Sequence, residues 1–368
     1  MKIAVVAGEA SGDLHASEVV RELKKLDPSL ELFGIGGDLL RKEGMTLLHH
    51  ASEMGIVGLF NVLRHLPMFR RVYNELLERI AREKPDAVFL VDYPEFNLRV
   101  ARRCKEQLGL PVVYYISPQI WAWRRGRVRH IAKYVDRMIV IFPFEEEFYR
   151  EHDVPVTYVG HPLIEQLAHV HKPPREHGRL RIALLPGSRR MEVRSLLPAM
   201  LDAVRILRAE REVEAYIIQA PTIERTELAS IVEQSGVEVA ILPHDRGEGV
   251  AAADIALSSS GTATLEAAVL GTPVVVMYRL SRATYALGKR LVRLPHWSLV
   301  NIIAGKEVVP ELIQSDVNGP RIADEVRRLV VPEQYERVSR ELKAIRGKLG
   351  TPGAARRAAE EIHKMVAG

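Results

Sequence analysis

The chain has 368 residues, a formal net charge of +5 at pH 7, and 47% hydrophobic and 27% charged residues. This composition is typical of an ordered globular protein, and the length predicts two domains rather than one. Cys104 is the single cysteine of the sequence, which excludes an intramolecular disulfide and a cysteine-based zinc site and indicates a reducing compartment.

No apolar run approaches the roughly 18 residues that a membrane-spanning helix needs. The excess positive charge therefore indicates an anionic partner at the surface, which could be nucleic acid, a phosphorylated small molecule or a membrane.

Short β-branched segments alternate with longer amphipathic segments from the start of the chain. The first apolar segment, KIAVVA, is too short for a signal peptide, so we expect a strand and a cytoplasmic protein. Uniformly apolar strands separated by helices predict a parallel, doubly wound sheet that is covered on both faces. The expected strands of this first series are 2–7, 30–34, 87–92, 111–116, 138–142 and 156–160.

A polar stretch with Pro173 and Pro174, at 169–179, interrupts the alternation and is interpreted as an interdomain linker. A second series of strands follows. We expect two Rossmann-like domains, 1–168 and 180–332, which face a central cleft and bind ligands at the carboxyl ends of their strands. The helical patterns within 333–368 could pack on either domain or on another subunit. The expected strands of the second series are 181–187, 214–220, 237–242, 254–259 and 273–278.

In the first domain, the segment VAGEASGD connects the first strand to a helix and contains four residues that could contact a ligand. Its glycines lack the GxGxxG spacing, which argues against a dinucleotide fingerprint. A capped turn without a ligand is an equally good reading of the segment. The candidates for the acceptor side are Glu9, Ser11, Gly12 and Asp13.

The apolar segment 54–77 also contains cations, and this combination is typical of a membrane interface. An ordinary buried helix would explain its apolar face as well. A second basic cluster, at 124–133, follows Trp121 and Trp123 and leaves nucleic-acid binding open. The candidates for membrane contact are Ile56, Val57, Leu59, Phe60, Leu63, Arg64, Arg70 and Arg71.

Asp92 is expected at the carboxyl end of a strand, where this fold places its ligands. As a general base it could take a proton from an acceptor hydroxyl, which typically contributes about 10²- to 10⁴-fold to a rate. The alternative role is helix capping, which suits Glu95 better. The histidines show no metal-ligand spacing, so no metal site is expected.

In the second domain, LLPGSR places a turn and Arg189 at the start of a helix. A cation there is locally unfavourable and therefore suggests a bound anion, which we expect to be a departing diphosphate. Gly187 and Ser188 belong to the same turn. The alternative, a solvated surface arginine, suits Arg190 and Arg194 better.

A second anion seat is expected at the loop 258–262, where a strand ends before a helix that begins near Thr264. Backbone N–H groups, hydroxyls and the helix dipole would hold a phosphate there. Glu266, expected in the first turn of the helix, could accept hydrogen bonds from ribose. Ser and Thr are also ordinary N-caps, which would explain the loop without a ligand. The phosphate-binding candidates are Ser259, Ser260, Gly261 and Thr262.

Several motifs follow one another along nearly the whole chain: VAGEASGD at 6–13, MGIVG at 54–58, VDYPEFN at 91–97, SPQIWAWR at 117–124, LLPGSR at 184–189, SSGTATLE at 259–266 and SLVNIIAG at 298–305. In this combination and order the chain resembles the lipid-A-disaccharide synthases.

The resemblance implies a GT-B glycosyltransferase that needs no metal or other cofactor. It implies inverting transfer from UDP-2,3-diacylglucosamine to 2,3-diacylglucosamine 1-phosphate (lipid X), which gives a β-1,6-linked disaccharide and UDP. It also implies peripheral association with the anionic surface of the inner membrane.

By the same resemblance, Asp92 matches the base, Arg189 a diphosphate-binding arginine, Glu266 the acid near the nucleoside and Asn301 a donor-binding asparagine. Two other functions are kept as alternatives: a UDP-sugar 2-epimerase on the same fold and a basic nucleic-acid-binding protein. A homodimer remains open.

Overall fold

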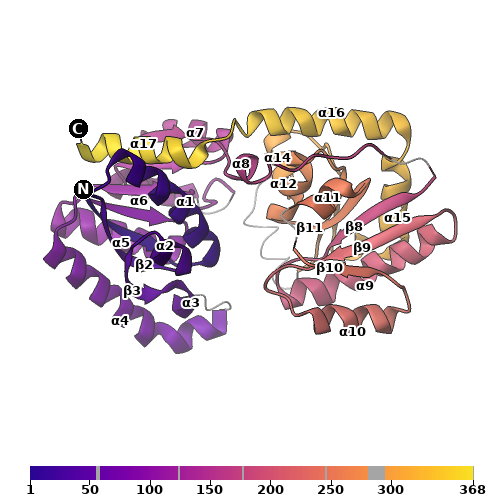
Figure 1. Cartoon of the computed structure of the whole chain (residues 1–368), viewed down its shortest axis with the longest axis horizontal. Coiled ribbons are helices and arrows are strands. Elements are labelled where there is room, and N and C mark those ends of the chain that lie inside the picture. Colours follow the sequence, from indigo (N-terminus) through magenta and orange to yellow (C-terminus); the bar gives the residue numbers. More distant parts are fainter. Residues whose placement is uncertain (55–58, 123–124, 176–177, 245–246, 281–294, 368) are drawn as a thin grey trace. The chain divides into compact units, whose positions relative to one another are not determined.

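The computed structural model describes residues 1–54, 59–122, 125–175, 178–244, 247–280 and 295–367. It divides into two compact units (Figure 1), the first comprising Met1–Pro162 with Thr351–Gly368 and the second Leu163–Gly350. Each unit contains one sheet and is described by itself.

The sheet of the first unit has the strand order β3-β2-β1-β4-β5-β6-β7, and its pairs are all parallel in the described residues. β4 has the sequence AVFLV and is buried at every position, because helices cover both faces of the sheet. The strands are β1 (Lys2–Ala7), β2 (Glu31–Gly36), β3 (Thr46–His50), β4 (Ala87–Val91), β5 (Val112–Tyr115), β6 (Arg137–Val140) and β7 (Val156–Tyr158).

The helices of this unit present apolar stripes to the sheet; for example, Val72, Leu76 and Ile80 of α4 lie in the same core cluster as Val88 and Leu90. The helices are α1 (Ala10–Leu26), α2 (Asp38–Lys42), α3 (Ala51–Met54), α4 (Leu59–Glu83), α5 (Pro94–Leu108), α6 (Val128–Tyr134), α7 (Pro143–Arg150) and α17 (Ala354–Ala367).

The second unit repeats the architecture with the strand order β10-β9-β8-β11-β12-β13, again parallel. Its strands are β8 (Leu180–Leu185), β9 (Val213–Ile218), β10 (Ala240–Leu242), β11 (Ile255–Ser259), β12 (Val274–Tyr278) and β13 (Glu311–Ile313). Its helices are α8 (Leu163–Gln166), α9 (Arg190–Arg208), α10 (Arg225–Ser235), α11 (Glu248–Ala252), α12 (Thr262–Val269), α14 (Leu299–Ala304), α15 (Gly319–Leu329) and α16 (Pro332–Lys348).

The predicted fold of two parallel α/β domains is confirmed, and each expected strand overlaps an observed one. Two strands were not predicted, and both lie at the edge of a sheet. β3 has the polar sequence TLLHH and is only partly buried, while β13 has three residues. An edge strand needs no continuous apolar run, because one side of it faces no neighbouring strand.

The division between the units differs from the expected boundary at 168/169. The segment expected to be a linker, 169–179, belongs to the second unit. Lys172 fastens it there, because its Nζ donates to the carbonyls of Ala251 and Ala253 and to Oγ1 of Thr272 at 2.7–3.2 Å. Burial lowers the pKa of Lys172 to about 8.

The two final helices, whose packing the sequence left open, go to different units. α16 packs on α12, α14 and α15. α17 packs on α1 (Figure 1) and is tied to the first unit by Thr157, which donates to Glu361 at 3.0 Å, and by Arg357, which donates to the carbonyl of Val159 at 2.8 Å.

The segment expected to contact a membrane is described only in part. Ile56 and Val57 lie outside the described residues, as do the side chains of Leu59, Phe60, Leu63 and Arg64. Arg70 and Arg71 are exposed on α4. Among the described helices, none is long and apolar enough to cross a bilayer.

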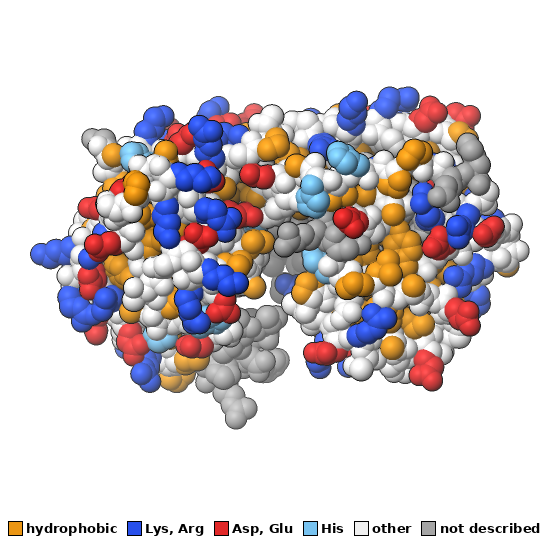
Figure 2. Space-filling view, viewed as in Figure 1, with side chains coloured by type: hydrophobic (Ala, Val, Ile, Leu, Met, Phe, Trp, Pro, Cys, Tyr) orange, Lys and Arg blue, Asp and Glu red, His pale blue; other side chains and the backbone are white. Residues whose placement is uncertain are grey.

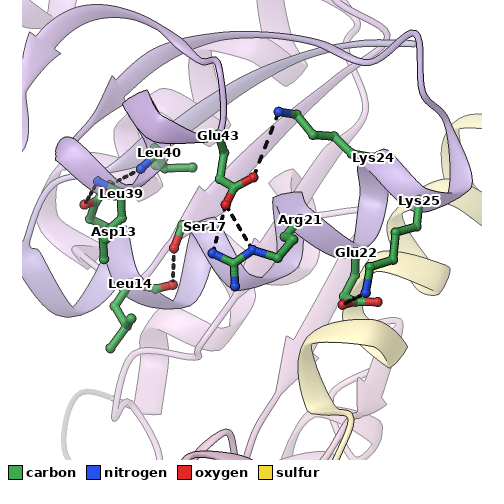
Figure 3. A network of polar contacts seen from close by, with 10 residues as sticks. All are labelled: Asp13, Leu14, Ser17, Arg21, Glu22, Lys24, Lys25, Leu39, Leu40 and Glu43. Atoms are coloured by element: carbon green, nitrogen blue, oxygen red, sulfur yellow. Dashed lines mark hydrogen bonds and ion pairs between the residues drawn. The ribbon is translucent and has the colours of Figure 1, made fainter.

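Asp13 has a structural role that the sequence did not predict. It lies inside α1, is 5% exposed, and points at the first turn of α2 (Figure 3). Its carboxylate accepts from the N–H groups of Gly37, Leu39 and Leu40 at 2.7, 3.0 and 3.2 Å. The carboxylate therefore satisfies the free donors at the start of α2 and is not available to an acceptor.

We predict that Asp13→Ala lowers the free energy of unfolding of the first unit by about 2 kcal/mol, because it leaves three backbone donors in a largely buried position without their acceptor. Urea denaturation followed by circular dichroism measures this loss. Asp38→Ala, on the exposed face of the same short helix, is the control and should cost at most about 0.5 kcal/mol. Equal losses in the two variants would contradict the capping role.

Candidate functional site

In each sheet, two neighbouring strands lead to helices on opposite sides, which is the point where open α/β sheets bind ligands. In the first unit these strands are β1 and β4, whose last paired residues are Ala7 and Val91. In the second they are β8 and β11, where Leu185 pairs with Ser258. The segments after these four strands therefore form two candidate half-sites.

Asp92 directly follows β4, and the polypeptide holds it in a rare backbone conformation. Asp92 and Tyr93 both have positive φ, of 47° and 50°, at a cost of about 1 kcal/mol each. The carbonyl of Asp92 accepts from the Tyr114 hydroxyl at 2.6 Å and from the Asn97 amide at 2.7 Å. Both donors are buried, so the turn that aims the Asp92 side chain is rigidly supported.

The environment of Asp92 changes its acidity. Desolvation by burial, together with the nearby charge of Glu9, raises the pKa of the Asp92 carboxyl to about 6. Such a carboxylate is a stronger base than one in water and is still ionised at neutral pH. The arrangement suits abstraction of a proton from a hydroxyl.

Glu9 reaches this position because the loop after β1 packs against the loop after β4. The ring of Tyr93 lies over Gly8, where a Cβ would come within 2.6 Å of Tyr93 Cδ1. Glu9 and Ser11 are exposed beside this contact, whereas Gly12 is buried in α1. Of the four residues predicted for the acceptor side, Glu9 and Ser11 are exposed, and Gly12 and Asp13 are buried.

Two further titratable groups of the first unit, Glu145 and His161, are buried. Glu145 is 1% exposed and accepts from Nε1 of Trp121 at 3.1 Å and from the N–H of Phe142 at 3.3 Å. Burial raises the pKa of Glu145 to about 8. Burial also lowers the pKa of His161 to about 3, which keeps the imidazole neutral beside the ring of Phe142. The Glu145 carboxyl therefore links Trp121, which follows β5, to Phe142, which follows β6.

In the second unit, the segments after β8 and β11 line one cavity of about 330 Å³. The cavity brings together the predicted residues of both anion seats. Ser258 is fully buried and does not line it. The predicted residues that line the cavity are Gly187, Ser188, Arg189, Ser259, Ser260, Gly261, Thr262 and Glu266.

The turn before α9 contains both a donor and a cation. Gly187 has φ of +119°, and a Cβ there would lie 2.5 Å from Oε2 of Glu192, so only glycine fits. Arg189 is the N-cap residue of α9, its side chain is 71% exposed, and its guanidinium pairs with Glu192 at 3.3 Å. Glu192 also accepts from the N–H of Ser188 at 3.3 Å.

Glu192 was not predicted. Its carboxylate takes up the donors that a phosphate would use, so an anionic ligand must compete with it. An acid at the third position of a helix is a recognisable signal, since it commonly reaches back to the helix start. His244, also a lining residue, has no such signal in the sequence.

The helix after β11 begins at Thr262, two residues earlier than expected, with Gly261 as its N-cap. The N–H groups of Thr262 and Ala263 therefore have no partner within the helix and lie on the cavity lining. A Cβ at Gly261 would meet open space. Glu266, expected in the first turn of α12, lies beyond it but still lines the cavity, so its contact with ribose stays a prediction.

Asn301 is placed differently from the prediction. Its side chain is fully buried, its Oδ1 accepts from the N–H groups of Val308 and Val309, and its Nδ2 donates to Val309 and Glu311, all at 2.8–3.1 Å. This amide has no hydrogen-bonding capacity left for a donor sugar. Its position contradicts direct binding, and Asn301 instead fastens α14 to the segment before β13.

In the described part of the chain, no group of three or more His, Cys, Asp and Glu side chains is arranged to hold a metal ion. The groups available to an anion are the guanidinium of Arg189, the hydroxyls of the loop 259–262 and the free N–H groups of α12.

The model of a family described as lipid-A-disaccharide synthetase matches residues 3–362. The chain is 46% identical to the lipid-A-disaccharide synthase of Myxococcus xanthus, with 99% of this chain and 97% of the relative covered. It is 41% identical to the lipid-A-disaccharide synthase of Geobacter sulfurreducens, with the same coverage of each.

Among solved structures, the chain is similar to the UDP-GlcNAc 2-epimerase from Neisseria meningitidis bound to UDP-GlcNAc, with a TM-score of 0.63, 15% identity and coverage of 99% and 100% of the two chains. The MurG protein of Acinetobacter baumannii gives a TM-score of 0.59 at 14% identity, with 99% of each chain covered. At such identities these likenesses establish the fold alone.

Proposed function

The chain belongs to the lipid-A-disaccharide synthase family, and from this premise we propose that its two half-sites carry the two halves of a glycosyl transfer. The protein is a glycosyltransferase of lipid A synthesis. The proposed donor is UDP-2,3-diacylglucosamine and the proposed acceptor is 2,3-diacylglucosamine 1-phosphate. The products are the β-1,6-linked disaccharide 1-phosphate and UDP.

The acceptor half of the reaction is assigned to the first unit. The Asp92 carboxylate takes the proton of the acceptor's 6-hydroxyl while that oxygen attacks C1 of the donor sugar. The observation that carries this assignment is the raised pKa of the Asp92 carboxyl, about 6, at a residue whose backbone carbonyl is held by Tyr114 and Asn97. A base whose pKa lies just below the working pH combines full ionisation with high basicity.

The donor half is assigned to the cavity of the second unit. As the bond between C1 and the diphosphate oxygen breaks, the electron pair leaves with UDP. Arg189, the hydroxyls of the loop 259–262 and the first N–H groups of α12 would stabilise the charge that develops on the diphosphate. Glu266 would accept hydrogen bonds from ribose. The proposal needs no metal, because these donors and the guanidinium supply the stabilisation.

Both proposed substrates carry acyl chains, so we place the reaction at the anionic surface of the inner membrane, with the protein on the cytoplasmic side. The apolar and basic segment 54–77 supports this location by its sequence.

The two alternatives have less support. An epimerase shares the fold, but the family match and the relatives at 41–46% identity concern lipid-A-disaccharide synthases. A nucleic-acid binder would need a continuous basic surface, whereas the face drawn in Figure 2 shows cationic side chains interspersed with anionic ones.

The first prediction from the proposal is product formation. Purified protein with both diacyl substrates should release the disaccharide and UDP in equal amounts, and EDTA should not lower the rate; mass spectrometry measures both products. UDP-N-acetylglucosamine alone should remain unchanged. Conversion of that compound without an acceptor would instead indicate an epimerase, and the absence of disaccharide under all conditions would overturn the assignment.

The second prediction concerns pH. Because a base of raised pKa is protonated below that pKa, kcat/KM should fall about tenfold per pH unit below pH 6. The negative charge of Glu9 helps to raise this pKa, so Glu9→Gln should move the acid limb to lower pH. Asp92→Asn should lower the rate by about 10²- to 10⁴-fold.

Glu95→Gln is the control for Glu9→Gln, since Glu95 pairs with Arg127 at 2.6 Å and is not among the groups that shift the pKa of Asp92. It should leave the acid limb in place. Full activity of the Asp92→Asn variant would show that Asp92 is not the base of the reaction.

The third prediction concerns the leaving group. Arg189→Ala should weaken UDP binding roughly 10- to 100-fold, the equivalent of losing one or two charge-assisted hydrogen bonds, as measured by isothermal titration calorimetry. Arg190→Ala is the matched control, because Arg190 is similarly exposed, pairs with Glu227 and does not line the cavity. Equal effects of the two variants would mean that only the general surface charge matters.

A further inference from the structure

A second, larger hollow in the first unit is separate from the residues assigned to the reaction. It is a groove of about 1050 Å³ lined by residues of α4, α5 and α6, helices that pack side by side (Figure 1). This volume is slightly above the ~300–1,000 Å³ that small-molecule pockets span. We call it the α4–α5 groove.

The α4–α5 groove is strongly cationic. Four arginines line it, Arg70, Arg99, Arg102 and Arg103, against one acid, Glu106. Glu106 is already held by Arg102 at 2.9 Å and by the Tyr134 hydroxyl at 2.5 Å. These contacts lower the pKa of Glu106 to about 2. No ion pair is formed by the other three arginines within the described residues.

The groove also has an apolar side. Leu66, which is 47% exposed, lies at one end of it with Pro67 and Phe69. Tyr73 and Phe96 form its floor, where their rings meet edge to face with centroids 5.9 Å apart. Single-stranded nucleic acid would need free ring faces on which to stack bases. Phe96 is only 8% exposed, so the floor offers apolar contact rather than a stacking platform.

We propose that the α4–α5 groove binds one anionic phospholipid molecule of the membrane, with the phosphate on Arg99 and Arg103 and an acyl chain along Leu66 and Phe69. The arginines that form no ion pair within the described residues match one or two negative charges, and the apolar floor matches a chain that a free phosphate lacks. Guanidinium groups favour phosphate because their planar N–H donors can bind two of its oxygens. This inference rests on the proposed membrane location of the reaction.

Such a site would orient the enzyme. Arg99, Arg102 and Arg103 lie on α5, the helix that begins two residues after Asp92. A lipid held along α5 would therefore fix the angle between that helix and the membrane surface. The acceptor, itself an anionic lipid in the same surface, would then be presented to Asp92 in a limited range of orientations.

The test uses the full chain and vesicles of phosphatidylcholine with and without phosphatidylglycerol. Co-sedimentation should show binding that depends on phosphatidylglycerol, and native mass spectrometry should show one retained phosphatidylglycerol per chain. Arg99→Gln with Arg103→Gln should lower the apparent affinity roughly 30-fold, at about fivefold per cation near an anionic surface, and should abolish the retained lipid.

Arg82→Gln with Arg129→Gln is the matched control, since it removes the same charge from exposed positions outside the groove. It should keep the retained lipid. Equal losses of vesicle affinity and retained lipid in the two double variants would show that only diffuse electrostatic attraction acts, and would contradict a specific site in the groove. A gel shift with single-stranded DNA that only the groove variant loses would assign the groove to nucleic acid instead.

A steric variant tests the shape of the groove without changing its charge. Asn74→Trp, at an exposed lining position, should block lipid retention while the arginines remain; retention at the level of the unmodified chain would contradict the proposal. Turnover of substrates dispersed in detergent reports the transferase separately. A variant that loses lipid retention but keeps turnover would show that the groove binds lipid without taking part in the reaction. Absence of turnover in the unmodified chain would contradict the proposed reaction and leave the lipid test unaffected.

Discussion

The pairing of β1 with β4, and of β8 with β11, is the contact on which both half-sites depend. In each sheet the chain crosses to the opposite side at that pair, so the two segments that follow lie at the same edge of the sheet, at the carboxyl ends of neighbouring strands. The register then sets which residues meet. Ala7 opposite Val91 brings Glu9 close to Asp92, and Leu185 opposite Ser258 brings Gly187 and Ser259 to one cavity.

The two half-sites use this common geometry in different ways. The backbone around Asp92 is rigid, with two residues of positive φ and a carbonyl that accepts from Tyr114 and Asn97. The Asp92 carboxyl is desolvated, and burial raises its pKa. Above that pKa, the ionised carboxylate is held in an environment that favours its neutral form, so burial of Asp92 opposes folding at neutral pH. Strain and unfavourable burial of this kind are common where a residue reacts.

The cavity of the second unit is more open and is organised by charge. Arg189 is largely exposed, and its present partner is Glu192 of the same helix. The diphosphate proposed to bind there would therefore replace an internal carboxylate, which orients the arginine in the structure described. The α4–α5 groove shows a third pattern, in which arginines without ion pairs in the described residues surround an apolar floor, as expected for contact with an anionic amphiphile rather than for chemistry.

Sequence by itself determined the class of fold, because the apolar pattern of strands and helices is local. Apolar strands such as AVFLV indicate a buried parallel sheet, whereas the residues at 187–189 and 259–262 are compatible with anion binding and with ordinary helix capping. Tertiary structure decided which of these residues share a site, because strand order and register join loops that are distant in the chain. It also showed that the side chains of Asp13 and Asn301 are occupied by internal hydrogen bonds and are not available to a ligand. The contacts of Tyr114 and Asn97 with the Asp92 carbonyl, and of Glu192 with Arg189, were not predicted. The tertiary structure also places α17 in the first unit. The sequence could not predict this, because the packing partner of an amphipathic helix depends on a complementary surface that no local pattern specifies.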